Sequence, residues 1–195
     1  MAVAKSKSTQ PAAGEASEGQ NAIELLKADH KEVAAMFEQF NSGDLDQDEK
    51  DELAEEICKA LTVHTQIEEE IFYPAAREAV EGDDEDLLDE AEVEHGSITE
   101  LVAAVEGHED DALFDAQVKV MSEWVKHHVK EEEEKMFPKV EETDLDLDEL
   151  GAQLAARKQE LMSDDEDEAE GEDEGEEDEG EEDEGEEDEG EEEEA

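Results

Sequence analysis

The chain has 195 residues, and its 70 acidic and 14 basic side chains give a formal net charge of −56. Residues 21–160 alone hold 43 acidic and 12 basic residues, and a surface of this sign repels nucleic acid and anionic membranes. We therefore expect no nucleic-acid and no membrane partner. One cysteine, no signal-peptide core and no long apolar stretch favour a cytoplasmic protein.

The first half of the chain predicts two helices after a flexible leader. Residues 1–20 are rich in Ala, Ser, Gly and Gln and show no apolar period. From Asn21, a favourable cap, to the Asn-Ser-Gly at 41–43, apolar residues and His30 recur at steps of three and four. A second helix is predicted over about residues 48–80, with Pro74 kinking it or starting its last turn.

The second half repeats this plan. Helices are predicted over about 88–107 and 111–140, with apolar residues again at steps of three and four. Residues 143–162 are expected to form an additional amphipathic helix that either packs on the bundle or contacts a second chain. Residues 163–195, a Glu/Asp/Gly repeat, are predicted to be disordered. The fold class expected for residues 21–142 is an all-α, up-and-down four-helix bundle.

One motif, His-x3-Glu with a proline ten residues after the histidine, occurs in the second and in the fourth helix. The two copies are His64, Glu68 and Pro74, and His128, Glu132 and Pro138. Corresponding residues lie 64 positions apart, while a single histidine ahead of each copy, His30 and His95, is repeated at 65. Residues i and i+4 share a helix face, so we expect all six histidines and glutamates of this set to point into the bundle.

This set of side chains predicts a metal site. A buried glutamate without a partner is costly, and two glutamates with four imidazoles are hard to satisfy without cations. Nitrogen and oxygen donors suit iron, manganese or zinc, and two bridging carboxylates suit two divalent ions. A lone core histidine is usually structural, but four of the six histidines occupy matching positions here. In the run 131–134 the repeat selects Glu132, with Glu133 as the alternative; His108 and His127 are expected at or near the surface.

These residues resemble the hemerythrin-like, HHE cation-binding family over roughly residues 21–140. The matching pieces are Asp29-His30, His64-x3-Glu68 with Phe72-Tyr73-Pro74, Glu94-His95, and His128-x3-Glu132 with Met136-Phe137-Pro138. The resemblance implies a bundle with two non-haem iron ions, oxo- or hydroxo-bridged. His30, His64, His95 and His128 would be terminal ligands, and Glu68 and Glu132 would bridge. Manganese or zinc would suit the same donors.

One departure from the family bears on function. Oxygen-carrying hemerythrins have a second histidine one turn after the third-helix ligand, where this chain has Thr99. The resemblance therefore favours a protein that binds or reacts with oxygen, peroxide or nitric oxide, in stress response or sensing, over a reversible carrier. The alternatives are iron sequestration or cation buffering without turnover, and an interaction protein whose acidic tail binds basic partners. A ferritin-like site is disfavoured, because Glu92-x-x-His95 is the single Glu-x-x-His match.

Overall fold

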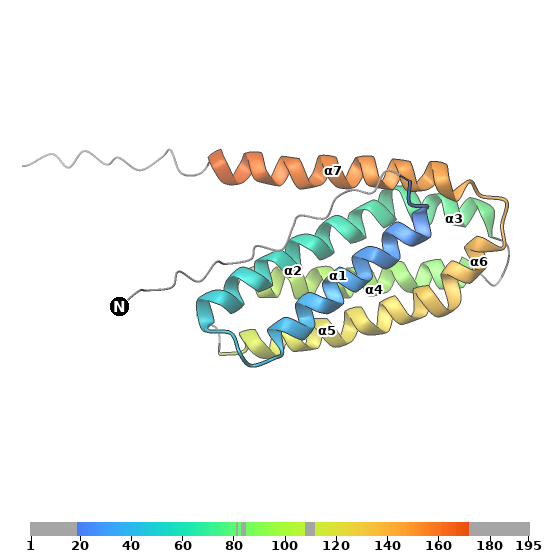
Figure 1. Ribbon diagram of the computed structural model, residues 1–195. Helices are drawn as coiled ribbons and strands as arrows, with labels where there is room; N and C mark the ends of the chain where they lie inside the picture. Colours follow the sequence, from blue (N-terminus) through green and yellow to red (C-terminus); the bar gives the residue numbers. More distant parts are fainter. Residues whose placement is uncertain (1–18, 81, 83–84, 108–111, 172–195) are drawn as a thin grey trace, which may run out of the picture.

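The bundle is formed by long helices that run up and down beside one another (Figure 1). The computed structural model describes residues 19–80, 82, 85–107 and 112–171, and no strand occurs within them. The long helices are α1 (Ala22–Phe40), α2 (Gln47–Ile67), α4 (Glu85–Glu106) and α5 (Phe114–Glu131). The predicted all-α four-helix bundle is thus confirmed. The predicted disorder of the leader and of the acidic tail concerns mainly residues 1–18 and 172–195, which lie outside the described ranges. Residues 163–171, predicted to belong to the disordered tail, instead form the end of a helix.

Local sequence explains where the first two helices begin. The side chains of Asn21 and Asp46 each accept a hydrogen bond from the backbone N–H three residues later, at Glu24 and Glu49. Those glutamates bond back to the N–H of the cap, which completes a capping box at each start. The predicted cap at Asn21 is therefore present.

A wide π-helical turn follows α2 and another follows α5. These turns, η1 (Glu68–Phe72) and η3 (Glu132–Met136), lead directly into α3 (Tyr73–Ala79) and α6 (Phe137–Glu141). A proline lies in the first turn of α3 and of α6. Proline has no N–H, and its ring clashes with the preceding turn of an α-helix, so a wider turn before it lets the helix continue. The sequence indicated that Pro74 disturbs the helix, but not the π turn.

The core consists of two apolar clusters with a polar layer between them. In each long helix the apolar residues on either side of that layer belong to different clusters. The pairs are Leu26 and Val33 in α1, Leu61 and Ile67 in α2, Ala91 and Ile98 in α4, and Val125 in α5 and Met136 in η3. The four helices thus bury their histidines at one level of the bundle, with apolar side chains above and below.

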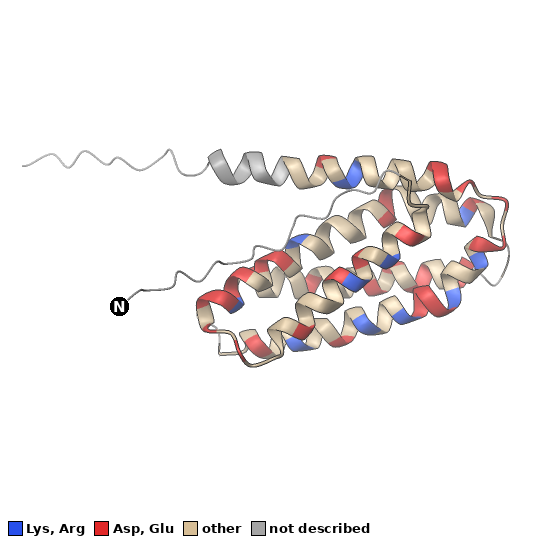
Figure 2. Cartoon of the chain, viewed as in Figure 1, with Lys and Arg blue, Asp and Glu red and all other residues tan. Residues whose placement is uncertain are grey.

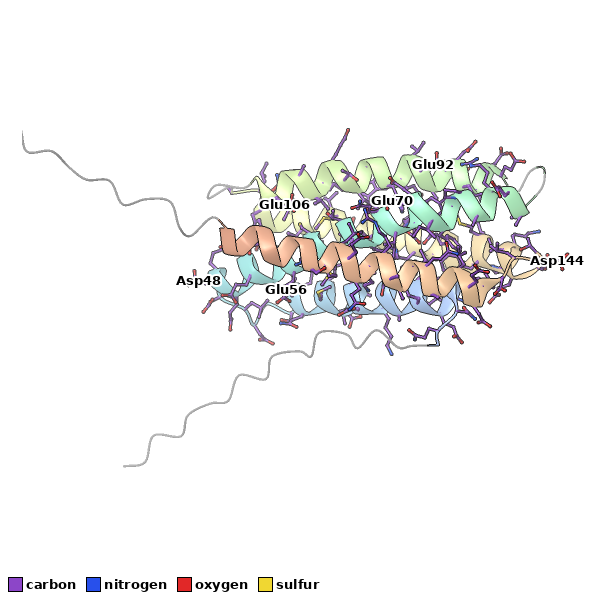
Figure 3. All side chains as sticks on the ribbon, turned by 90° about the horizontal axis from the view of Figure 1, so that it is seen from above. Asp48, Glu56, Glu70, Glu92, Glu106 and Asp144 are labelled. Atoms are coloured by element: carbon purple, nitrogen blue, oxygen red, sulfur yellow. The ribbon has the colours of Figure 1, made fainter. Side chains whose placement is uncertain are left out.

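The additional helix packs on the bundle. α7 (Leu147–Gly171) lies along α1, α2 and η1, as Figures 1 and 3 show from two directions. It starts and ends later in the chain than the predicted segment 143–162. Leu150 and Leu154 are buried in the same apolar cluster as the start of α1. A Cβ atom on Gly151 would lie 2.5 Å from the backbone oxygen of Gln20, so α7 approaches α1 as closely as glycine allows.

Acidic residues are spread over the whole length of the bundle (Figure 2). Figure 2 shows Asp and Glu on every long helix, with Lys and Arg between them. In Figure 3 Asp48 lies near one end of the molecule and Asp144 near the other. No helix within the described ranges combines the length and the apolar character that crossing a membrane requires.

Candidate metal centre

The structure brings the six residues selected by the repeat into the polar layer of the core. His30, His64, His95 and His128 come from α1, α2, α4 and α5, and Glu68 and Glu132 start the two π turns. All six are at most 5% exposed. The helical spacing that predicted a common inward face therefore places them together.

The donor atoms form two groups that share the carboxylates. Around the first, Nε2 of His30 lies 3.1 Å from Nε2 of His64 and 3.2 Å from Oε2 of Glu132, and Nε2 of His64 lies 3.2 Å from Oε2 of Glu68. Around the second, Nε2 of His95 lies 3.1 Å from Nε2 of His128 and 3.3 Å from Oε2 of Glu68. Nε2 of His128 lies 3.4 Å from Oε2 of Glu132. Glu68 and Glu132 thus each contact one histidine of either group.

These separations fit metal coordination. Ligand atoms about 2.1 Å from one ion lie roughly 3.0 Å apart in octahedral and roughly 3.4 Å apart in tetrahedral geometry. Three of the carboxylate oxygens, both of Glu68 and Oε2 of Glu132, are buried without a hydrogen-bond partner among the described residues. Buried oxygens of this kind need a cation or a proton. The donor set therefore suits two cations that share Glu68 and Glu132.

A second ring of carboxylates lies behind the histidines. Nδ1 of His30 is 2.9 Å from Glu133, Nδ1 of His95 is 3.0 Å from Glu69, and Nδ1 of His128 is 2.9 Å from Glu94. Nδ1 of His64 faces Asp29 at the longer distance of 3.6 Å. A carboxylate on Nδ1 fixes the ring and leaves Nε2 as the donor for a metal. The sequence pattern indicated Glu133 only as an alternative to Glu132 as a metal ligand, and it did not predict this outer role.

Tyr73 distinguishes the two groups and was missed as a site residue. Its hydroxyl donates to Oε1 of Glu132 at 2.8 Å and lies 3.1 Å from Nε2 of His95. Phe137 occupies the equivalent position 64 residues later and stacks on His30, with ring centroids 5.8 Å apart. In a regular α-helix five residues turn about 140° beyond a full circle, which would have placed Tyr73 away from Glu68. The wider π turn changes this angle and places the phenol of Tyr73 in the polar layer, next to Glu132.

Burial and close charges shift the protonation of this layer. Burial, together with the nearby Glu132 carboxylate, raises the pKa of Glu68 well above its usual value. Burial also acts on His30, but the Glu132 carboxylate, 3.2 Å from Nε2, outweighs it and raises the pKa of His30 to about 9. Burial lowers the pKa of His64 to about 4. Without metal the layer is therefore expected to hold protons on His30 and Glu68.

A small apolar cavity adjoins the first group of donors. It has a volume of about 10 Å³, close to the room that one water molecule needs. Its walls contain five apolar side chains and five polar ones. The apolar residues are Val33, Leu61, Ile98, Val125 and Val129, and the polar residues are Asp29, His30, His64, Thr65 and His128. Thr99 does not contribute to it, because this residue is exposed and its hydroxyl bonds the His95 carbonyl at 2.9 Å. A space of this size has room for a molecule no larger than about one water.

The two remaining histidines are not part of the polar layer as the structure describes it. His127 is exposed, and its Nε2 lies 3.3 Å from Oε1 of Glu94 and 4.0 Å from Oε2 of Glu131. Glu94 therefore lies between the exposed His127 and the buried His128. The other predicted surface histidine, residue 108, falls in a range that the structure does not describe.

Fold and site together define a class: a four-helix bundle whose core carries a mixed histidine–carboxylate cluster of the cation-binding kind. The Hemerythrin HHE cation binding domain profile matches residues 21–140, and the chain belongs to this family, as predicted. It is 26% identical over 145 residues to the protein Rv2633c of Mycobacterium tuberculosis, covering 72% of this chain and 87% of that protein.

Two further similarities extend the comparison. A DNA nickase of Nostoc sp. is 30% identical over 118 residues, which make up 60% of this chain but only 32% of the nickase. The crystal structure of a Hemerythrin HHE cation binding domain-containing protein, the Rv2633c homologue from Mycobacterium kansasii, superposes with a TM-score of 0.66. At 23% identity it covers 78% of this chain and 94% of that structure, and supports the same fold.

Proposed function

We propose that the chain binds two iron ions in the polar layer and reacts there with oxygen, peroxide or nitric oxide. The proposal is supported by the two donor groups, each with two imidazole nitrogens, which both contact Glu68 and Glu132. His30 and His64 would hold one ion, and His95 and His128 the other. Bound iron would supply the redox chemistry toward the small molecule.

The donor chemistry supports iron over softer metals. Imidazole and carboxylate suit iron, manganese and zinc, whereas copper(I) prefers thiolates. Cys58 is buried in the apolar cluster on one side of the layer, and burial raises the pKa of its thiol to about 12. It is therefore unsuited to binding metal as a thiolate. Two divalent ions would also balance the buried carboxylates.

The protein's own contribution is to position donors, exclude water and admit a small ligand. The carboxylates behind His30, His95 and His128 orient the rings. The apolar walls around the cavity favour a molecule such as oxygen over a polar substrate. Tyr73, hydrogen-bonded to Glu132, holds a proton beside the second group.

The activity named for the Nostoc relative is not part of the proposal. The match covers 32% of that nickase, and residues 21–160 of this chain have 43 acidic and 12 basic residues. A surface of this charge repels the phosphate backbone of DNA.

The first experiment measures iron content and optical spectrum. Ferrous iron is added to the full chain without oxygen, unbound metal is removed, and air is then admitted. We expect two irons per chain and an oxo-bridge charge-transfer band in air. Glu68→Gln and Glu132→Gln should each lose both ions, since each carboxylate serves both groups. Glu134→Gln, an exposed position in the same π turn as Glu132, should bind iron like the wild type.

Two results would contradict the proposal. One is a wild-type chain that retains no iron, and the other is a Glu68→Gln variant with full iron occupancy. A further assay separates reaction from storage. The iron-loaded protein is mixed with many equivalents of hydrogen peroxide, and the peroxide concentration is followed over time. Consumption beyond the iron present supports a reactive centre, while retention of iron without consumption supports sequestration.

A further inference from the structure

One of the four histidines lacks the outer hydrogen bond that the other three make. Nδ1 of His64 lies 3.6 Å from Oδ2 of Asp29, against 2.9 to 3.0 Å for the corresponding contacts of the other rings. Within the described residues, neither of these two buried atoms has a hydrogen-bond partner. A buried donor and acceptor that face each other without bonding need a physical reason.

Lys158 of α7 contacts the same carboxylate. Its Nζ donates to Oδ1 of Asp29 at 2.6 Å, whereas His64 faces the other oxygen, Oδ2. The ammonium also offsets the negative charge that would otherwise act on the His64 ring. Asp29 is 7% exposed, which makes the ion pair stronger than one on the surface.

The other half of the bundle shows the same carboxylate position without a lysine. Glu94 follows Asp29 by 65 residues and precedes His95 as Asp29 precedes His30. Its Oε2 lies 2.9 Å from Nδ1 of His128, while its Oε1 faces the exposed ring of His127. The two halves of the repeat thus differ in the side chain that contacts the outer carboxylate: a lysine at Asp29 and an exposed histidine at Glu94.

The position of Lys158 is set by the packing of α7. Leu154, one turn earlier, is fully buried, and Gly151 lies against the backbone of residues 20–22. On the same helix Arg157 donates two hydrogen bonds to Glu70, at 2.8 and 3.2 Å. Lys158 is therefore held beside Asp29 by the fold.

The consequence concerns the relative strength of the two ion positions. A carboxylate that accepts from Nδ1 orients an imidazole and makes Nε2 a better metal donor. We propose that Lys158 is a positioning residue that makes the two ion positions unequal. By holding Asp29 away from His64, it weakens the His30–His64 position relative to the His95–His128 position. The inference rests on the proposed binding of two ions.

The test compares stepwise affinities for ferrous iron. The full chain is titrated without oxygen in a calorimeter, with a competing chelator where binding is tight. The wild type should show two separate steps. Lys158→Met keeps a side chain of similar length without the charge, so Asp29 can accept a hydrogen bond from Nδ1 of His64. The affinity of the weaker binding step should then increase about tenfold. The stronger step should stay where it is.

Two further variants separate this role from simple anchoring of α7. Arg157→Met removes the neighbouring ion pair to Glu70 and should leave the ratio of the two affinities unchanged. In an Asp29→Asn background, Lys158→Met should have no further effect on that ratio, because the carboxylate through which the lysine acts is gone.

A direct readout is the proton NMR spectrum of the zinc-loaded protein. Imidazole Nδ1 protons in strong hydrogen bonds resonate far downfield. The Lys158→Met spectrum should contain one such signal more than the wild type, that of the His64 Nδ1 proton. The inference is overturned if Lys158→Met leaves the affinity ratio unchanged, or if Arg157→Met changes it equally. A chain that binds no ions at all would instead contradict the proposed function.

Discussion

Glu68 and Glu132 place two carboxylates in a layer closed on both sides by apolar clusters. Without metal this arrangement is costly, since burial and the neighbouring carboxylate both raise the pKa of Glu68. The unfolded chain would instead expose Glu68 as an ordinary carboxylate. The carboxylates proposed to bind metal are therefore expected to weaken the metal-free fold.

Glu68→Gln tests this conflict. We expect the variant to lose metal binding but to raise the free energy of unfolding of the metal-free protein at pH 7 by about 1–3 kcal/mol, because a neutral amide does not have to take up a proton when the chain folds. Urea unfolding after treatment with a chelator measures the free energy of unfolding of the metal-free proteins. Glu134→Gln, exposed in the other π turn, should change this free energy by less than about 0.5 kcal/mol. A destabilised Glu68→Gln protein would mean that the carboxylate has a structural role.

The stability of the metal-free protein should also depend on pH through His30. Its folded pKa of about 9 exceeds the usual value near 6.5. The protonated ring thus stabilises the fold fully below about pH 6.5, and this contribution, at most about 3 kcal/mol, is lost as the pH rises through about 9. The raised pKa of Glu68 acts in the same direction.

Thermal unfolding between pH 6 and pH 9.5 measures this dependence. The metal-free wild type should become less stable across the range, and His30→Gln should show a smaller decline. The metal-loaded protein should behave oppositely, because metal ligands must be deprotonated and affinity rises with pH. A metal-free protein whose stability increases from pH 6.5 to 9 would contradict the assigned direction.

At the scale of elements, the sequence predicted the long helices and their inward residues better than it predicted the connections between them. His64 and Glu68 could be paired because four residues bring a side chain back to the same helix face. Tyr73 could not be placed, because the π turn changes that periodicity at Glu68. The contact between Lys158 and Asp29 joins residues 129 positions apart, which no local pattern reveals.

The docking of α7 on α1 depends on one glycine. A Cβ at position 151 would lie 2.5 to 2.8 Å from backbone atoms of residues 20–22, so Gly151→Ala should force α7 outward and destabilise the protein by about 1–3 kcal/mol. Gly96→Ala is the matched control, since nothing lies within 4 Å of a Cβ there. Because alanine is the better helix former, Gly96→Ala should stabilise by about 0.5–1 kcal/mol.

Denaturant unfolding of both variants distinguishes close packing from general helix propensity. If both substitutions stabilised the protein, α7 would not be packed against the start of α1 as the structure has it. A displaced α7 should also carry Lys158 away from Asp29. Gly151→Ala is therefore expected to shift the ratio of the two iron affinities in the same direction as Lys158→Met.

At the scale of the whole molecule, acidic charge opposes folding. Residues 21–160 hold 43 acidic and 12 basic side chains, and Figure 2 shows the acidic ones spread over all the long helices. Like charges confined to a compact bundle repel one another more than in the extended chain. The apolar clusters and any bound cations must offset this repulsion.

Salt should therefore stabilise the metal-free protein. Raising sodium chloride from about 0.05 M to about 1 M shortens the screening length to about 3 Å, and the melting temperature should rise by several degrees. A variant with Glu38, Glu52 and Glu100, exposed residues of three different helices, replaced by glutamine should melt higher at low salt and respond less to added salt. Potassium chloride should act like sodium chloride, because screening depends on charge and not on the identity of the ion. A melting temperature that is independent of salt in both proteins would show that the acidic surface does not limit the stability of the bundle.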